Sequence, residues 1–128
     1  MPNDCWNHIT VITHTDPDEL ITLIHNEFMY KDDNDKLLFH KHIELLERGE
    51  KGIKINCWSA WKPDFDWLSK MIHNYKSCWI KNRWNVEDGL NGIWIGQMRE
   101  DGPNIINYNW EELSIEAEFY YFKSSDSP

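Results

Sequence analysis

Cysteine and histidine are the residues of this chain best suited to chemistry. The three cysteines, at positions 5, 57 and 78, lie far apart, and no pair has the CxxC spacing of zinc ribbons and thioredoxin-like sites. A cysteine nucleophile would need a histidine beside it, and a buried structural thiol is far commoner. His40, His42 and Glu44 alternate and would share one face of a strand, but no further strong metal ligand follows nearby. We therefore predict no catalytic residue, no metal site and no cofactor.

Two pairs of carboxylates are the next candidates for acid–base chemistry. Asp64 and Asp66 lie where a helix is expected to begin, and Asp64 is a natural N-cap there. Glu87 and Asp88 precede Gly89 in an expected turn, where aspartate is favoured for local backbone bonding. Capping and turn formation account for all four, so we prefer these roles to a general acid–base pair.

The composition predicts one soluble domain. The chain has 128 residues, 14% of them aromatic, and 22 acidic against 13 basic residues give a net charge of −9. That charge opposes non-specific binding to nucleic acid or to anionic membranes. The sequence contains neither a secretory signal nor an apolar run long enough to span a membrane. We expect a cytoplasmic protein with a domain over residues 1–122 and a disordered, serine-rich tail over 123–128.

The pattern of apolar residues predicts alternating strands and helices. Expected strands are 5–13, 53–58, 77–85 and 93–98, with helices over 17–30, from 64 to 73, and from 110 to 120. Residues 37–47 are ambiguous, and we favour a short strand followed by a helical turn. This order matches the ferredoxin-like α+β fold, an antiparallel sheet with two helices on one face. An extra C-terminal hairpin strand and a terminal helix would be added to it.

Four short motifs support a resemblance to a known family. They are Met1-Pro2-Asn3-x-Cys5-x-Asn7, Ser59-Ala60-Trp61-Lys62-Pro63, Trp84-x-x-Glu87-Asp88-Gly89 and Gly92-x-Trp94-x-Gly96. The chain resembles the YubB ferredoxin-like domain family of phage, plasmid and large-virus proteins, over residues 1–13 and 53–98. Ser59, Lys62 and Asp64 depart from the family's Thr-Ala-Trp-Ser-Pro-Pro motif, and a central insertion is missing, as in a shortened relative. The resemblance implies the fold and a viral or mobile-element origin, and it implies no catalytic residue.

The tryptophans are the best candidates for contacts with a partner, because aromatic patches with few charges are where proteins dock. We predict a non-enzymatic protein–protein interaction module that binds a viral or host protein, in a virion or assembly, or itself as a homo-oligomer. Alternatives are an acidic mimic of nucleic acid, a small enzyme, and an RNA-binding module using Lys81, Arg83 and Trp84, against which the net charge counts. The predicted contact residues are Trp58, Trp61, Trp84, Trp94, Glu87 and Asp88.

Overall fold

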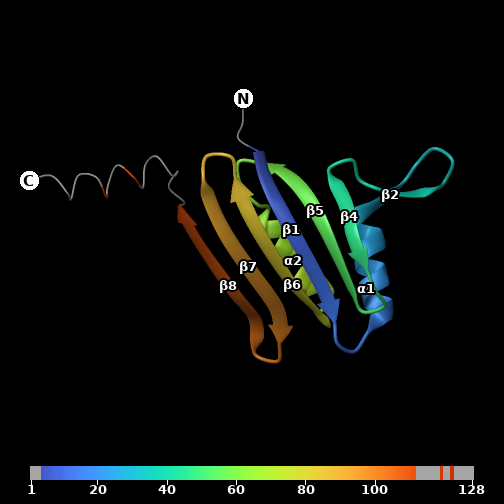
Figure 1. The fold of residues 1–128 in the computed structure, drawn as a ribbon. Helices are drawn as coiled ribbons and strands as arrows, with labels where there is room; N and C mark the ends of the chain where they lie inside the picture. Colours follow the sequence, from blue (N-terminus) through green and yellow to red (C-terminus); the bar gives the residue numbers. More distant parts are fainter. Residues whose placement is uncertain (1–3, 112–118, 120–121, 123–128) are drawn as a thin grey trace, which may run out of the picture.

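A computed structural model describes residues 4–111, 119 and 122, and strands dominate this part of the chain (Figure 1). The helical elements are α1 (Pro17–Leu23), its π-helical continuation η1 (Ile24–Phe28) and α2 (Phe65–Asn74). The strands are β1 (Asp4–Thr13), β2 (Met29–Lys31), β3 (Leu37–Phe39), β4 (Ile43–Arg48), β5 (Gly52–Ala60), β6 (Cys78–Val86), β7 (Leu90–Arg99) and β8 (Gly102–Glu111).

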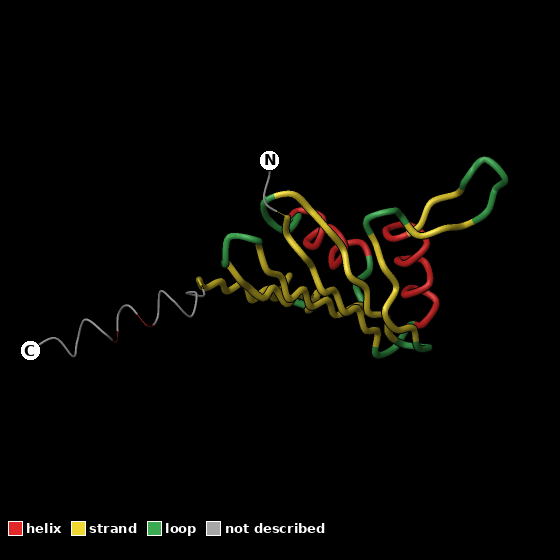
Figure 2. Tube along the Cα trace, turned by 45° about the horizontal axis from the view of Figure 1, so that its top comes forward, coloured by secondary structure: helices red, strands yellow, loops and turns green. Residues whose placement is uncertain are grey.

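Six of these strands form one antiparallel sheet in the order β4-β5-β1-β6-β7-β8, and β2 and β3 form a separate hairpin. The central strand β1 pairs with β5 on one side and with β6 on the other. Figures 1 and 2 show α1 and α2 on the same face of the sheet. The other face, called the helix-free face below, has no described helix over it.

The ferredoxin-like prediction is wrong, because the described chain is mostly sheet: eight strands, six of them in a single antiparallel sheet, and only two α-helices. Residues 43–48, read as a helical turn, form strand β4, which pairs with β5 and carries a bulge between Leu45 and Glu47. Residues 102–111 form β8, which pairs with the whole of β7. Trp110 therefore ends a strand and does not begin the expected terminal helix. The rest of that helix and the tail over 123–128 lie outside the described residues.

Both α-helices begin where their sequences predict. The Asp16 side chain accepts a hydrogen bond from the Glu19 backbone N–H (3.1 Å), and Pro17 fits the first turn of α1. Asp64 caps α2 in the same way through the Trp67 N–H (3.0 Å). The buried faces of α1, η1 and α2 pack on the sheet through Leu20, Leu23, Ile24, Phe28, Leu68, Met71 and Ile72.

Two glycines of β7 make room for two core tryptophans. Trp94 is 2% exposed and Trp84 is 5% exposed. A Cβ atom on Gly96 would lie 2.4 Å from the Trp94 ring, and one on Gly92 would lie 2.2 Å from the Trp84 ring. The absence of a side chain at these positions lets each indole lie flat against a strand, so these tryptophans provide cohesion.

Candidate functional site

The helix-free face collects the polar and aromatic side chains of the central strands. Successive side chains of a strand point to opposite faces, and β1 alternates accordingly: Ile9 and Val11 are buried under the helices while His8 and Thr10 are on the other side. Applying the same alternation and the strand registers to β5–β8 places further residues on this face. They include Trp6, Lys54, Asn56, Trp58, Trp79, Lys81, Arg83, Asn85, Asn91, Ile93, Tyr108 and Trp110.

Strand register arranges these residues in two neighbouring rows that cross the sheet. Trp6 lies opposite both Trp58 and Asn85. Asn85 lies opposite Asn91, which in turn lies opposite Trp110. The first row therefore crosses five strands, with tryptophans on the outer strands β5 and β8 and two amides in the middle. At ~4.8 Å between strands, it spans roughly 19 Å.

The second row lies two residues along each strand from the first. His8 lies opposite Asn56 and Arg83, and Ile93 joins Arg83 to Tyr108. Asn56 donates a hydrogen bond to Glu44 on β4 (3.3 Å), while its buried Oδ1 has no hydrogen-bond partner in the part of the chain that the structure describes. A buried amide oxygen without a partner costs about 1–3 kcal/mol, so a bound N–H group would be stabilising here.

Two adjoining hollows lie along these rows. One, of about 430 Å³, has His8, Arg83, Asn85, Asn91 and Trp110 among its lining residues. The other, of about 330 Å³, is lined by Trp6, His8, Asn56, Cys57, Trp58 and Asn85. Because His8 and Asn85 line both, the hollows form one continuous surface of rings and amides.

This face carries three basic side chains, Lys54, Lys81 and Arg83, on a chain with a net charge of −9. Lys81 lies 6.0 Å from the centre of the Trp79 ring, and neither Lys81 nor Arg83 has an ion-pair partner among residues 4–111. Lys54 pairs with Glu47 at 3.6 Å. The first row contains no carboxylate, whereas Glu44 on edge strand β4 lies opposite Asn56 and continues the second row.

The structure separates the residues predicted for partner contact. Trp58, 38% exposed, belongs to the first row, and Trp61, 59% exposed, lies in the loop between β5 and α2 with a left-handed φ of 70°. Trp84 and Trp94 lie in the core and offer almost no surface. The six residues therefore do not form one patch, and partner binding by them stays a prediction.

Glu87 and Asp88 make local hydrogen bonds at the turn between β6 and β7. Glu87 accepts one from the Asp4 backbone N–H (3.3 Å), and Asp88 accepts one from the Leu90 N–H (3.2 Å). The Asp88 bond is the predicted local turn chemistry, whereas Glu87 instead ties the turn to the first residue of β1. The two rows were not predicted from the sequence, although alternation along β1 does place Trp6 and His8 on the same face.

The three cysteines are buried free thiols. Burial raises the pKa of Cys5, and it raises the pKa of both Cys57 and Cys78 from 9.0 to about 11. Thiols with such pKa values stay protonated near neutral pH and are poor nucleophiles. Within the described residues, no group of three or more His, Cys, Asp and Glu side chains is placed to hold a metal ion.

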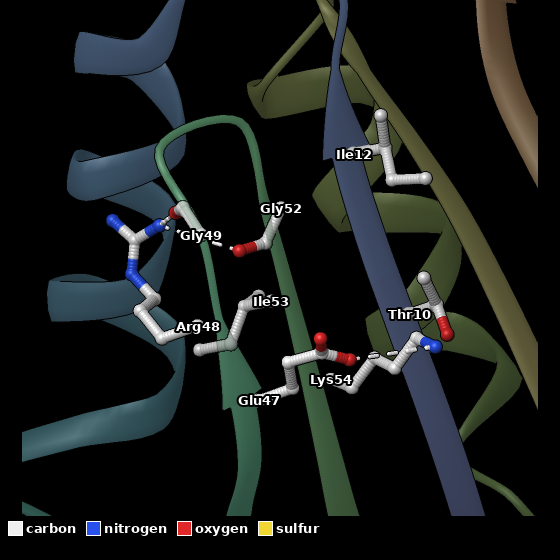
Figure 3. A pocket seen from close by; sticks show the side chains of 8 residues that line it. All are labelled: Thr10, Ile12, Glu47, Arg48, Gly49, Gly52, Ile53 and Lys54. Atoms are coloured by element: carbon white, nitrogen blue, oxygen red, sulfur yellow. Dashed lines mark hydrogen bonds and ion pairs between the residues drawn. The ribbon is translucent and has the colours of Figure 1, made fainter.

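A further pocket, of about 220 Å³, lies at the turn between β4 and β5 (Figure 3). Arg48 donates hydrogen bonds to the carbonyl oxygens of Gly49 and Gly52, which stabilise the turn. Figure 3 shows Lys54 reaching Glu47 beside Thr10. The charged groups of this pocket already have partners, so the two rows are the better candidate site.

Neither α-helix in the described ranges is long and apolar enough to cross a membrane. Comparison of the chain with protein-family models, with curated proteins and with solved structures yields no match.

Proposed function

We propose that the helix-free face binds a single strand of nucleic acid. The observation that supports this most is the first row, in which Trp58 and Trp6 at one end and Trp110 at the other enclose the amides of Asn85 and Asn91. Unpaired bases stack on exposed aromatic rings and bond through their edges to polar side chains. A duplex hides these base faces, so a single strand is the ligand this row fits.

Each residue type has a distinct task in this proposal. The indoles of Trp6, Trp58 and Trp110 stack bases, and a row of this length suits about two or three of them, as on other sheets that bind RNA. The amides of Asn85 and Asn91 bond base edges, and Asn56 Oδ1 accepts a base N–H. Arg83 and Lys81, which have no carboxylate partner among the described residues, contact phosphates.

The net charge of −9 sets the expected strength of binding. A negative protein repels a polyanion at long range, which slows association. Two or three phosphate contacts give a log–log salt slope of about −1.4 to −2.1 for a single strand. Binding is therefore expected to be weak and to depend mainly on stacking.

Fluorescence anisotropy with a labelled ten-nucleotide RNA of mixed sequence tests this proposal. Titrations at 50, 100 and 200 mM salt should show binding with a shallow salt dependence. The DNA strand of the same sequence shows whether the 2′-hydroxyl contributes, and the RNA duplex should bind much more weakly. Absence of binding at 50 mM salt, or equal affinity for the duplex, would contradict the proposal.

A second candidate function, self-association, is supported by edge strand β8. This ten-residue strand has one charged residue, Glu111, and exposes Ile105, Ile106, Tyr108 and Trp110. A long, exposed, uncharged edge is a template for pairing with another strand, and an antiparallel pairing with a second copy brings no like charges together along most of its length. Ile105→Lys should then convert a dimer into a monomer in light scattering. A wild-type chain that is monomeric at high concentration would exclude this function.

A further inference from the structure

A cavity on the helix-covered face, which shares only Trp58 with the two rows, contains an unusual polar group. It measures about 280 Å³ and lies between β1, β5, β6 and the beginning of α2. Asn7 and Asn82 line it, and they are 4% and 1% exposed. Buried amides normally have hydrogen-bond partners for their polar atoms, so the partners of these two amides are informative.

Hydrogen bonds determine which way both amides point. Asn7 Nδ2 donates to the Cys57 carbonyl oxygen and to Ser59 Oγ, each at 3.0 Å. Asn7 Oδ1 then accepts from Asn82 Nδ2 at 2.9 Å. A flipped Asn82 amide would place two oxygens against each other, so its nitrogen must face Asn7.

This orientation leaves the side-chain oxygen of Asn82, which lines the cavity, as an unused hydrogen-bond acceptor. Asn82 Oδ1 is buried and has no hydrogen-bond partner within the described part of the chain. Asn7, by contrast, uses both ends of its amide within the protein. The cavity therefore has one unpaired hydrogen-bond acceptor, which a ligand with an N–H or O–H donor would satisfy.

The rest of the lining also favours a donor. Asp64 lines the cavity and uses Oδ1 to cap α2, which leaves its second carboxylate oxygen available. His42 is the one basic side chain among the lining residues, which include no lysine or arginine, and Ile9, Trp67 and Leu68 supply apolar walls. The neighbouring carboxylate Glu27 is already occupied by the Trp67 indole and the Tyr75 hydroxyl, at 2.9 Å each.

We infer that this cavity binds a small, flat organic cation that carries N–H groups, such as an amidinium or a protonated aminoheterocycle. One N–H bonds Asn82 Oδ1, the positive charge faces Asp64, and the ring lies against the apolar walls. The volume is just below the ~300–1,000 Å³ of sites for drug-sized ligands, which limits the ligand to a single ring or a fused pair. Asn82 and Asp64, which carry this inference, belong to neither row, and Trp58 is the only residue that the cavity shares with the proposed nucleic-acid surface.

Benzamidine is the probe that tests this inference, with neutral benzamide as its isosteric control. In ¹H–¹⁵N spectra of the full chain, benzamidine should shift the Asn82 side-chain amide and the Trp67 indole N–H. Asp64→Asn removes the charge and keeps the N-cap, because asparagine caps a helix as well as aspartate does. It should weaken benzamidine binding about tenfold, while leaving the weaker binding of benzamide unchanged.

Asp66→Asn is the matched control, because Asp66 lies in the same first turn of α2 and does not line the cavity. It should leave both affinities unchanged. Equal losses from the two variants would show that benzamidine responds only to the overall negative charge. That result, or the absence of shifts at Asn82 and Trp67 at millimolar benzamidine, would overturn the inference.

Discussion

Trp6 on β1 lies directly opposite Trp58 on β5, and both side chains leave the sheet on its helix-free face. Opposite residues of an antiparallel pair have Cβ atoms about 4.5–5.5 Å apart, so the two indoles form one aromatic platform. Because His8 and Arg83 lie immediately beside this platform, stacking surface and positive charge occur together on a chain that is acidic as a whole.

Arg83 should contribute a phosphate contact. Arg83→Gln keeps a long polar side chain and removes the charge, so single-strand affinity should fall and the log–log salt slope should become shallower by about 0.7. Anisotropy titrations at several salt concentrations measure both. Arg99→Gln, at the far end of β7, is the control and should change neither; an unchanged slope in Arg83→Gln would exclude the contact.

Gly92 and Gly96 should be intolerant of any side chain. Alanine at either position brings a methyl group within 2.2–2.4 Å of a buried indole ring, and such overpacking typically costs about 1–3 kcal/mol of unfolding free energy. Urea denaturation measures the loss. Gly49→Ala is the matched control, because its Cβ would meet nothing closer than 3.9 Å, and it should stay within about 0.5 kcal/mol of wild type.

The buried amide pair should be energetically coupled. Asn7→Ala removes the acceptor of the Asn82 amide nitrogen and the side-chain donor to the Cys57 carbonyl, and an unsatisfied buried group costs about 1–3 kcal/mol. Asn82→Ala leaves Asn7 Oδ1 without its Asn82 donor. In a double-mutant cycle the two losses should not add, because the pair shares one hydrogen bond. Strict additivity in urea melts would contradict the pairing.

Stability should fall at high pH because of the buried thiols. Folding raises the pKa of Cys57 and Cys78 from 9.0 to about 11, so between these values the unfolded chain loses protons that the folded chain keeps. The resulting stabilisation is fully present below pH 9 and is lost as the pH rises towards 11. Urea melts at pH 8, 9, 10 and 11 measure this decline. Cys78→Ala should show a smaller decline, and an equal decline would assign the pH dependence to other groups.

Much of the fold could be predicted from local pattern, and the part that failed depended on pairing. The strands around Ile9, Ile55 and Ile80 and the capped starts of α1 and α2 were all visible in the sequence. Residues 43–47 were read as a helical turn, and the extended piece at 105–107 was taken to give way to a helix at Trp110. Leu45, Leu46 and Trp110 also suit helical spacing, and only their pairing with β5 and β7 identifies them as strand residues.

The candidate site was harder to predict because it depends on register between distant strands. Trp6 and Asn85 are neighbours only because β1 pairs with β6, and Trp110 joins them only through β7. Tryptophan density pointed instead to Trp84 and Trp94, which the structure places in the core. The sequence alone identifies the aromatic residues, but it does not show which of them lie on the surface of the sheet and which pack in the core.

The most direct test of the central claim compares three variants in binding the ten-nucleotide RNA at 50 mM salt. Stacking is worth about 1–3 kcal/mol per base, so Trp6→Ala and Trp110→Ala should each weaken binding about 5- to 150-fold. Trp61→Ala removes a more exposed tryptophan from outside the rows and should leave the affinity unchanged. Equal affinity of all three variants and the wild-type chain would contradict the account.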